Sequence, residues 1–126
     1  MSKCVLIVDD EEDVRAIAQM GLEMATDWNI LCASSGEEAL AIAATKQPDI
    51  ILLDMMMPDM DGRTTLQKLK ANPTTQQIPV ILVTAKIQQS EQESFADMDV
   101  AAVLAKPFRP LKLADQINAV LPDTYL

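Results

Sequence analysis

The most constraining feature of the sequence is the stretch from Asp49 to Gly62, DIILLDMMMPDMDG. Its four consecutive apolar residues, 50–53, show no polar alternation, which is typical of a strand buried on both faces of a parallel sheet. The run ends at the carboxylate of Asp54, and Pro58 interrupts the chain soon afterwards. Open α/β sheets bind their ligands beyond the carboxyl ends of their strands, so Asp54 is a candidate site residue.

Apolar runs and helical periodicity alternate along the rest of the chain. Together with 50–53, the apolar runs predict strands at 4–8, 28–33, 80–83 and 100–105. Helices are predicted after each strand, the first from the acidic residues 11–13 to about residue 25, and the others at 37–46, 62–71, 87–98 and 109–121. This strict alternation predicts one α/β domain, a doubly wound parallel sheet with right-handed crossovers and helices on both faces.

The helical periodicity also predicts which residues face the core. These are Val14, Ile17, Ala18, Gly21 and Ala25 in the first helix, Ala39, Leu40 and Ala43 in the second, and Leu66 and Leu69 in the third. Cys4 and Cys32 lie in predicted strands without a C-x-x-C pair, so we expect small buried core residues rather than a disulfide or redox pair.

Composition narrows the functional classes. A chain of 126 residues should form one domain. Its net charge of −9 disfavours direct binding of nucleic acid, since phosphate backbones are bound by clustered Lys and Arg. The absence of histidine removes the commonest general base and most transition-metal sites. Residues 1–3 show no signal-peptide pattern and no apolar run is as long as a membrane span, so we expect a soluble, cytoplasmic protein.

Polar side chains follow four of the five predicted strands. Asp9 and Asp10 follow the first strand, Asp54 the third, Thr84 the fourth and Lys106 the fifth. In a parallel sheet these side chains meet at one edge. A single Asp at such a position is commonly a cap, but three carboxylates with a hydroxyl and an ammonium are typical of a functional site.

The chemistry that fits this set is phosphoryl transfer. Three clustered carboxylates repel one another unless a cation neutralises them, and an all-oxygen set favours Mg²⁺. One carboxylate could then act as a nucleophile that accepts a phosphoryl group as an aspartyl-phosphate. The Lys106 ammonium and the Thr84 hydroxyl could contact phosphoryl oxygens.

Four motifs carry a resemblance to a known family. They are VDDE at 8–11, LLDMMMPDMDG at 52–62, ILVTA at 81–85 and LAKPF at 104–108. With them, the chain resembles the receiver domain of two-component response regulators, of the single-domain chemotaxis type, over nearly its full length. The resemblance implies a flavodoxin-like (βα)5 fold with sheet order 2-1-3-4-5. It also implies one receiver domain over 1–126, with a short tail at 122–126 and no output domain.

The resemblance implies a role for each matching residue. Asp54 would be the phosphoacceptor. Asp9 and Asp10 would bind Mg²⁺ together with Asp54, and Met56 would offer its backbone carbonyl to the metal. Thr84 would be the switch hydroxyl and Lys106 the phosphate-binding lysine, aimed by a cis bond to Pro107.

Two departures from the family pattern concern the output. Many receivers have an aromatic residue three positions before the lysine, whose rotation reports phosphorylation, whereas this chain has Val103. Asp99-Val100 replaces the usual Gly-Ala turn before the last strand. We expect the phosphorylation chemistry to survive both changes and the aromatic readout to be lost.

The expected function is a stand-alone receiver, a monomer or weak dimer, that takes a phosphoryl group from a histidine kinase or histidine phosphotransfer protein. It would signal by binding an unknown downstream protein, and would not be an enzyme beyond self-catalysed transfer and autodephosphorylation. An alternative is a receiver-like interaction module that is never phosphorylated, which Val103 leaves open. A Mg²⁺-dependent phosphohydrolase is a weaker alternative, because it would need an acid where Met56 stands.

Overall fold

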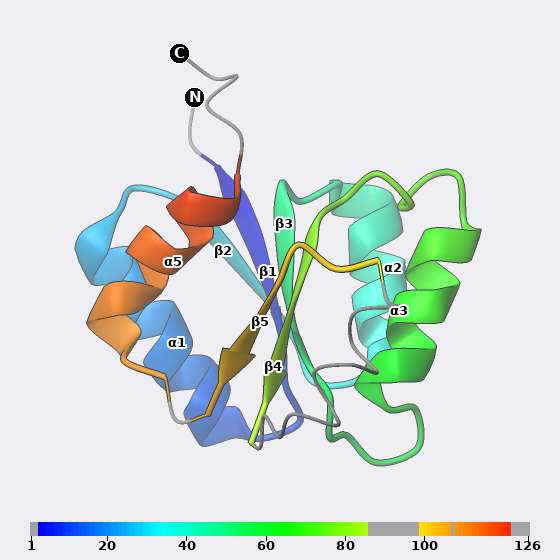
Figure 1. The fold of residues 1–126 in the computed structure, drawn as a ribbon, viewed down its shortest axis with the longest axis horizontal. Helices are drawn as coiled ribbons and strands as arrows, with labels where there is room; N and C mark the ends of the chain where they lie inside the picture. The colour runs from blue at the N-terminus through cyan, green and yellow to red at the C-terminus, as the bar shows by residue number, and fades with distance from the viewer. Residues whose placement is uncertain (1–2, 86–98, 107, 122–126) are drawn as a thin grey trace.

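The computed structural model describes residues 3–85, 99–106 and 108–121 (Figure 1). Its strands are β1 (Cys4–Val8), β2 (Asn29–Ala33), β3 (Ile50–Asp54), β4 (Val80–Thr84) and β5 (Ala102–Ala105). Its helices are α1 (Glu12–Ala25), α2 (Gly36–Lys46), α3 (Gly62–Ala71), the 3₁₀ helix η1 (Pro110–Lys112) and α5 (Leu113–Val120). The helix predicted at 87–98 lies outside the described residues.

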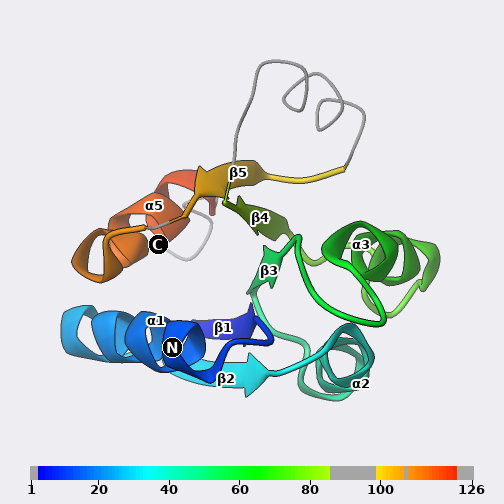
Figure 2. The same ribbon diagram turned by 90° about the horizontal axis from the view of Figure 1, so that it is seen from below.

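The strands form one parallel sheet in the order β2-β1-β3-β4-β5, which confirms the predicted flavodoxin-like topology. Helices α1 and α5 cover one face, and α2 and α3 cover the other (Figures 1 and 2). The strand at 100–105 is shorter than predicted, and the helix at 109–121 begins with the tight turn η1 at Pro110. In that turn the amide of Lys112 bonds to the carbonyl of Arg109, as expected of a 3₁₀ helix.

The core lies on both faces of the sheet, because the central strands are covered twice. Every residue of β3 and β4 is buried. Alternate residues of β1 point to opposite sides: Val5 and Ile7 pack with α1 and α5, and Leu6 and Val8 pack with α2 and α3. The rigid central strands therefore hold the sheet's carboxyl edge in place.

The inward face of α1 differs from the prediction. Ala18 and Gly21 are buried as expected and Val14 is half-buried, but Leu22 is the third buried residue, Ile17 is 49% exposed, and Ala25 is exposed. Gly21 packs closely against η1, because a Cβ at this position would lie 2.5 Å from the carbonyl oxygen of Pro110. Ile17 lies one turn earlier on the same side of the helix and stays half exposed.

The prediction for the cysteines was partly wrong. Both thiols are free, as expected, but both are only half-buried. Cys32 lies on β2, the edge strand of the sheet, where its Sγ is 3.4 Å from Oε1 of Gln19. An edge strand has a neighbour on one side alone, so its residues keep more contact with water.

Candidate functional site

The carboxyl edge of the sheet gathers the polar side chains that the sequence placed there. Asp54 ends β3, Thr84 ends β4, and both are buried. Asp9 directly follows β1 and is also buried, whereas Asp10 beside it is exposed. One carboxylate oxygen from each of Asp9, Asp10 and Asp54 lies within 4.8 Å of the others.

Lys106 joins two of these acids. Its Nζ lies 2.8 Å from Oδ2 of Asp9 and 3.2 Å from Oδ1 of Asp54. The lysine follows β5, and its amide donates to the carbonyl of Thr84 at 2.8 Å. The extension of the β4–β5 ladder beyond the strands therefore aims the ammonium across the edge toward β1 and β3.

Backbone and side-chain hydrogen bonds fix Asp9. Its Oδ1 accepts from the amide of Glu11 at 2.9 Å, and its own amide donates to the carbonyl of Ala33 at 3.1 Å. The guanidinium of Arg15 donates to the Asp9 carbonyl at 2.6 Å. One oxygen of the carboxylate is thus used to hold the β1–α1 turn, and the other faces Lys106.

The loop after Asp54 is held just as closely. The amide of Met56 donates to Oδ1 of Asp54 at 3.2 Å, while the Met56 side chain is 73% exposed. The amide of Gly62 donates to the carbonyl of Met55 at 3.0 Å. A Cβ on Gly62 would collide with the Asp54 carbonyl oxygen, so glycine is needed here because the two backbone segments approach closely. It is not needed for backbone conformation, since the φ of Gly62 is not positive.

The same loop starts α3. Asp61 is the N-cap of the helix, and its Oδ1 accepts from the amide of Thr64 at 2.8 Å. This hydrogen bond holds the pKa of the Asp61 carboxyl below its usual value, since it favours the charged form. Asp59 has a φ of 67°, a left-handed conformation that Asp and Asn tolerate better than most residues.

Burial and neighbouring charge shift the protonation of the site. Burial raises the pKa of Asp54, and the Asp9 carboxylate raises it further; the Met56 amide and Lys106 offset only part of this. Burial alone would lower the pKa of Lys106, but its hydrogen bond to Asp9 and the charges of Asp54 and Asp9 outweigh burial and raise it. The ammonium therefore stays charged and compensates the two buried acids incompletely.

The donor set fits a hard divalent cation. Carboxylate oxygens from three residues converge, and one ammonium is the single cation bonded to the buried pair among the described residues. Mg²⁺ binds through one or two carboxylates plus water and phosphate oxygens, and prefers oxygen ligands such as these.

The structure thus brings together Asp9, Asp10, Asp54 and Lys106, and it places Thr84 at the end of β4, the strand beside β3, as the strand ends predicted. The predicted cis bond to Pro107 lies outside the described residues. Three contacts were not predicted: the ion pair between Lys106 and Asp9, the bond from Arg15 to the Asp9 carbonyl, and the packing of Gly62 on Asp54. Only the last had a sequence signal, the DG pair that opens α3.

Comparison with known proteins decides the family. Residues 5–118 match the family model for the response regulator receiver domain. The chain belongs to this family. Phosphorylation-based signalling is the function that membership supports, and receivers are signalling domains that bind Mg²⁺ at an acidic pocket.

Individual relatives agree with this assignment. The chain is 35% identical over 124 residues to the phosphate regulon transcriptional regulatory protein PhoB of Pseudomonas aeruginosa, covering 98% of this chain and 54% of that protein. It is 33% identical to the alkaline phosphatase synthesis transcriptional regulatory protein PhoP of Bacillus subtilis, covering 96% of this chain and 49% of that one. The chain therefore spans about half the length of these curated relatives.

Solved structures give the same fold. The chemotaxis response regulator CheY4 of Vibrio cholerae superposes with a TM-score of 0.88 at 26% identity, covering 96% of this chain and 100% of that one. A response regulator from Chloroflexus aurantiacus superposes with a TM-score of 0.86 at 29% identity, over 95% and 98% of the two chains. Within the described ranges, every helix is too short or too polar to cross a bilayer.

Proposed function

We propose that this receiver accepts a phosphoryl group on Asp54 from a histidine kinase or a histidine phosphotransfer protein. The supporting observation is the position of Asp54. Like Asp9, its buried carboxylate touches Lys106 and belongs to the metal-fitting cluster, but its bonds to Lys106 and to the Met56 amide both use Oδ1, whereas Asp9 uses both of its oxygens. A carboxylate oxygen of Asp54 attacks phosphorus, and the phosphorus–nitrogen bond of the donor phosphohistidine breaks to release the imidazole.

The roles of the other residues follow from charge. Asp9, Asp10 and Asp54, with the Met56 carbonyl, would hold Mg²⁺, which neutralises negative charge on the transferring phosphoryl group. The Lys106 ammonium already lies against Asp54 and is placed to pair with a phosphoryl oxygen. Thr84, buried at the end of the adjacent strand β4, would donate its hydroxyl to another oxygen once Asp54 is modified.

The phosphoryl group would then act as a switch. Added charge at Asp54 draws Lys106 and Thr84 toward it, and both lie on the β4–β5 side of the sheet. We propose that the response is delivered by binding a downstream protein, through a surface that does not use an aromatic residue at Val103. The proposal also includes a receiver domain that is monomeric or weakly dimeric, with autodephosphorylation as its only turnover, located in the cytoplasm.

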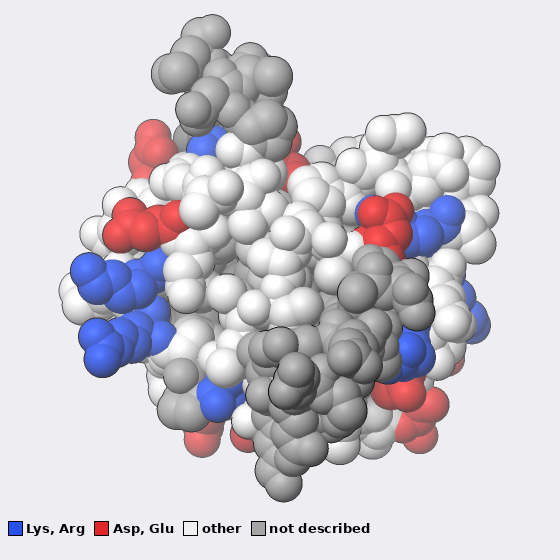
Figure 3. Space-filling model, viewed as in Figure 1, with Lys and Arg blue, Asp and Glu red and all other residues white. Residues whose placement is uncertain are grey.

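Charge supports protein partners over nucleic acid for this domain. Nineteen acidic residues oppose ten basic ones. On the face shown in Figure 3, the Lys and Arg side chains of the described residues lie in small separate groups rather than in one broad basic patch. One relative is the DNA-binding dual master transcriptional regulator RpaA of Synechocystis. This chain covers 49% of the length of that protein. Direct binding of DNA by this domain would need a basic surface.

The second candidate is an interaction module that is never phosphorylated. Val103 favours it, because this half-buried β5 residue leaves no aromatic side chain to rotate when the acceptor is modified. Against it stands the cluster of three acids, which costs stability and gains function only with a cation or a phosphoryl group.

Intact-protein mass spectrometry after incubation with Mg²⁺ and acetyl phosphate separates the two candidates. Phosphorylation predicts the mass of one added phosphoryl group, lost in Asp54→Asn and with a chelator. Asp59→Asn is the matched control, since it removes an acid from the same loop and asparagine also tolerates the positive φ there. An unchanged mass with the wild type would favour the unphosphorylated module, and a modified Asp54→Asn would assign the acceptor elsewhere.

A further inference from the structure

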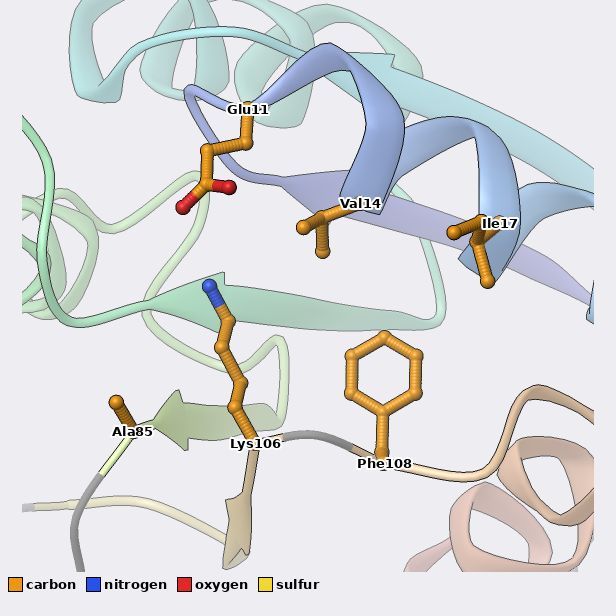
Figure 4. A pocket seen from close by; sticks show the side chains of 6 residues that line it. All are labelled: Glu11, Val14, Ile17, Ala85, Lys106 and Phe108. Carbon is orange, nitrogen blue, oxygen red and sulfur yellow. The ribbon is translucent and has the colours of Figure 1, made fainter.

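A cavity opens between the start of α1 and the segment that joins β5 to η1. It has a volume of about 390 Å³ and is lined by Glu11, Val14, Ile17, Ala85, Lys106 and Phe108 (Figure 4). This volume falls in the range of sites that hold small organic molecules. The cavity adjoins the acidic site through Lys106 but extends away from it, along α1.

One end of the cavity is apolar. Val14 and Ile17 project from neighbouring positions on α1, and the ring of Phe108 faces them from the opposite wall (Figure 4). Ile17 is 49% exposed, so a ligand that covers it would remove apolar surface from water. An aliphatic wall facing an aromatic ring is suited to a flat, apolar group.

The other end of the cavity is lined by one basic and one acidic side chain, and the acidic one carries the unpaired charge. The Glu11 carboxylate and the Lys106 ammonium face one another across this end (Figure 4). Lys106 is already bonded to Asp9 and Asp54. The Glu11 carboxylate, by contrast, forms no hydrogen bond or ion pair with any described residue. The side chains that follow Glu11, at Glu12 and Asp13, are exposed acids.

We propose that this cavity binds small aromatic amines, with the ring between Ile17 and Phe108 and the ammonium at Glu11. A cation is favoured over an anion because Lys106, the basic group among the described lining residues, is already paired with Asp9 and Asp54, whereas Glu11 is not paired. The proposed amine site adjoins the phosphoacceptor site through Lys106 but does not include Asp54. Its existence does not depend on phosphorylation of Asp54, although a bound ligand would contact Lys106.

The test is titration of the whole protein with 2-phenylethylamine, followed through the methyl signals of Val14 and Ile17 in carbon–proton NMR spectra. Two matched probes accompany it: phenylacetate, which has the same ring with the opposite charge, and ethylamine, which has the charge without the ring. We expect the aromatic amine to bind at least about tenfold more tightly than phenylacetate, from charge. We expect a similar margin over ethylamine, from burial of the ring.

Variants locate the site. Glu11→Gln should remove most of the preference for amine over carboxylate, and Ile17→Ser should weaken both aromatic probes about fivefold or more. Met24→Ser, on an exposed position of the same helix outside the cavity, is the control and should change neither. Circular dichroism of each variant checks that it is folded.

A further variant addresses the neighbouring acids. Asp10→Asn should leave binding of the aromatic amine largely intact. Loss of binding in Asp10→Asn but not in Glu11→Gln would mean that the amine binds the acidic cluster, and would overturn the proposal. Equal affinities for the amine and phenylacetate, or no methyl shift with any probe, would overturn it as well.

Discussion

The Nζ atom of Lys106 lies 2.8 Å from Oδ2 of Asp9, closer than to Oδ1 of Asp54 at 3.2 Å. In the unphosphorylated protein the lysine is therefore a counter-ion for the acidic pair rather than a group waiting for phosphate. A lysine in this position has a structural role as well as the chemical role proposed for it.

Lys106→Met should destabilise the protein, because it leaves Asp9 and Asp54 buried without their ammonium. We expect a loss of roughly 2 kcal/mol in the free energy of unfolding, measured with urea in the presence of a chelator. Lys112→Met, which removes an exposed lysine from η1, should cost far less. An equal loss in the two variants would show that Lys106 does not compensate the buried acids.

Asp54→Asn should have the opposite effect at neutral pH without metal. Burial and the neighbouring Asp9 carboxylate raise the pKa of Asp54, so the native state holds this charge unfavourably. We expect the free energy of unfolding to rise by about 1 kcal/mol in the amide variant. The Lys106→Met change should then cost less in the Asp54→Asn background, a coupling that a double-mutant cycle measures. Additive effects would contradict the interpretation.

The strand ends could be predicted from the sequence because each one is the point where an apolar run meets a polar residue. An apolar run stops at Asp54, at Thr84 or at Asp9, and parallel topology brings those ends together without further information. The pairing of Lys106 with Asp9 could not be predicted in this way. The two residues are 97 positions apart, and the sequence pattern gives no measure of which carboxylate lies nearer.

The inward face of α1 shows a second limit. Ile17 and Leu22 are both apolar and both fit a helical stripe, so periodicity alone does not choose between them. Which residues of α1 are buried depends on segments distant in the sequence, such as that of Pro110, which packs against Gly21. Ile17 stays half exposed and forms part of one wall of the cavity of Figure 4.

Asp61 should contribute pH-dependent stability. Its pKa is lowered by the Thr64 amide, so the contribution is present above the unfolded-state pKa and is lost as the pH falls through the lower folded-state value. Asp61→Ala should cost about 1 kcal/mol at neutral pH through loss of the cap. Asp61→Asn keeps a capping oxygen and should be nearly neutral.

The pH profile provides the check. The difference between wild type and Asp61→Ala, from urea unfolding at a series of pH values, should shrink as the acid is protonated below about pH 4. The difference between Asp61→Asn and Asp61→Ala should stay constant over the same range. A wild-type difference that does not change with pH would contradict a charged cap.

Mg²⁺ should stabilise the protein through Asp10 although Asp10 is exposed. Binding to the native state alone adds about 2.7 kcal/mol at a concentration 100-fold above the dissociation constant. We expect Asp10→Asn to lose most of this gain, because it removes one of the three carboxylates whose oxygens converge. Asp59→Asn should keep the gain. Thermal unfolding with Mg²⁺ and with a chelator measures it, and a full gain in Asp10→Asn would remove that residue from the metal site.

Gly62→Ala should disturb the loop that follows Asp54, because Gly62 packs against the backbone of Asp54 and Met55. Its new Cβ would lie 2.7 Å from the Cα of Met55 and would collide with the Asp54 carbonyl oxygen, so the backbone around Asp54 must move. We expect a loss of about 2 kcal/mol in stability. Phosphorylation by acetyl phosphate should also slow, because the same movement displaces the Met56 amide from the acceptor carboxylate.

The control for this prediction is Gln67→Ala, a substitution at an exposed position of the same helix α3. It should change neither the stability nor the rate of phosphorylation appreciably. If Gly62→Ala lost stability but was phosphorylated at the wild-type rate per folded molecule, the loop would be tolerant of displacement. The close approach of Gly62 to Asp54 would then serve folding alone.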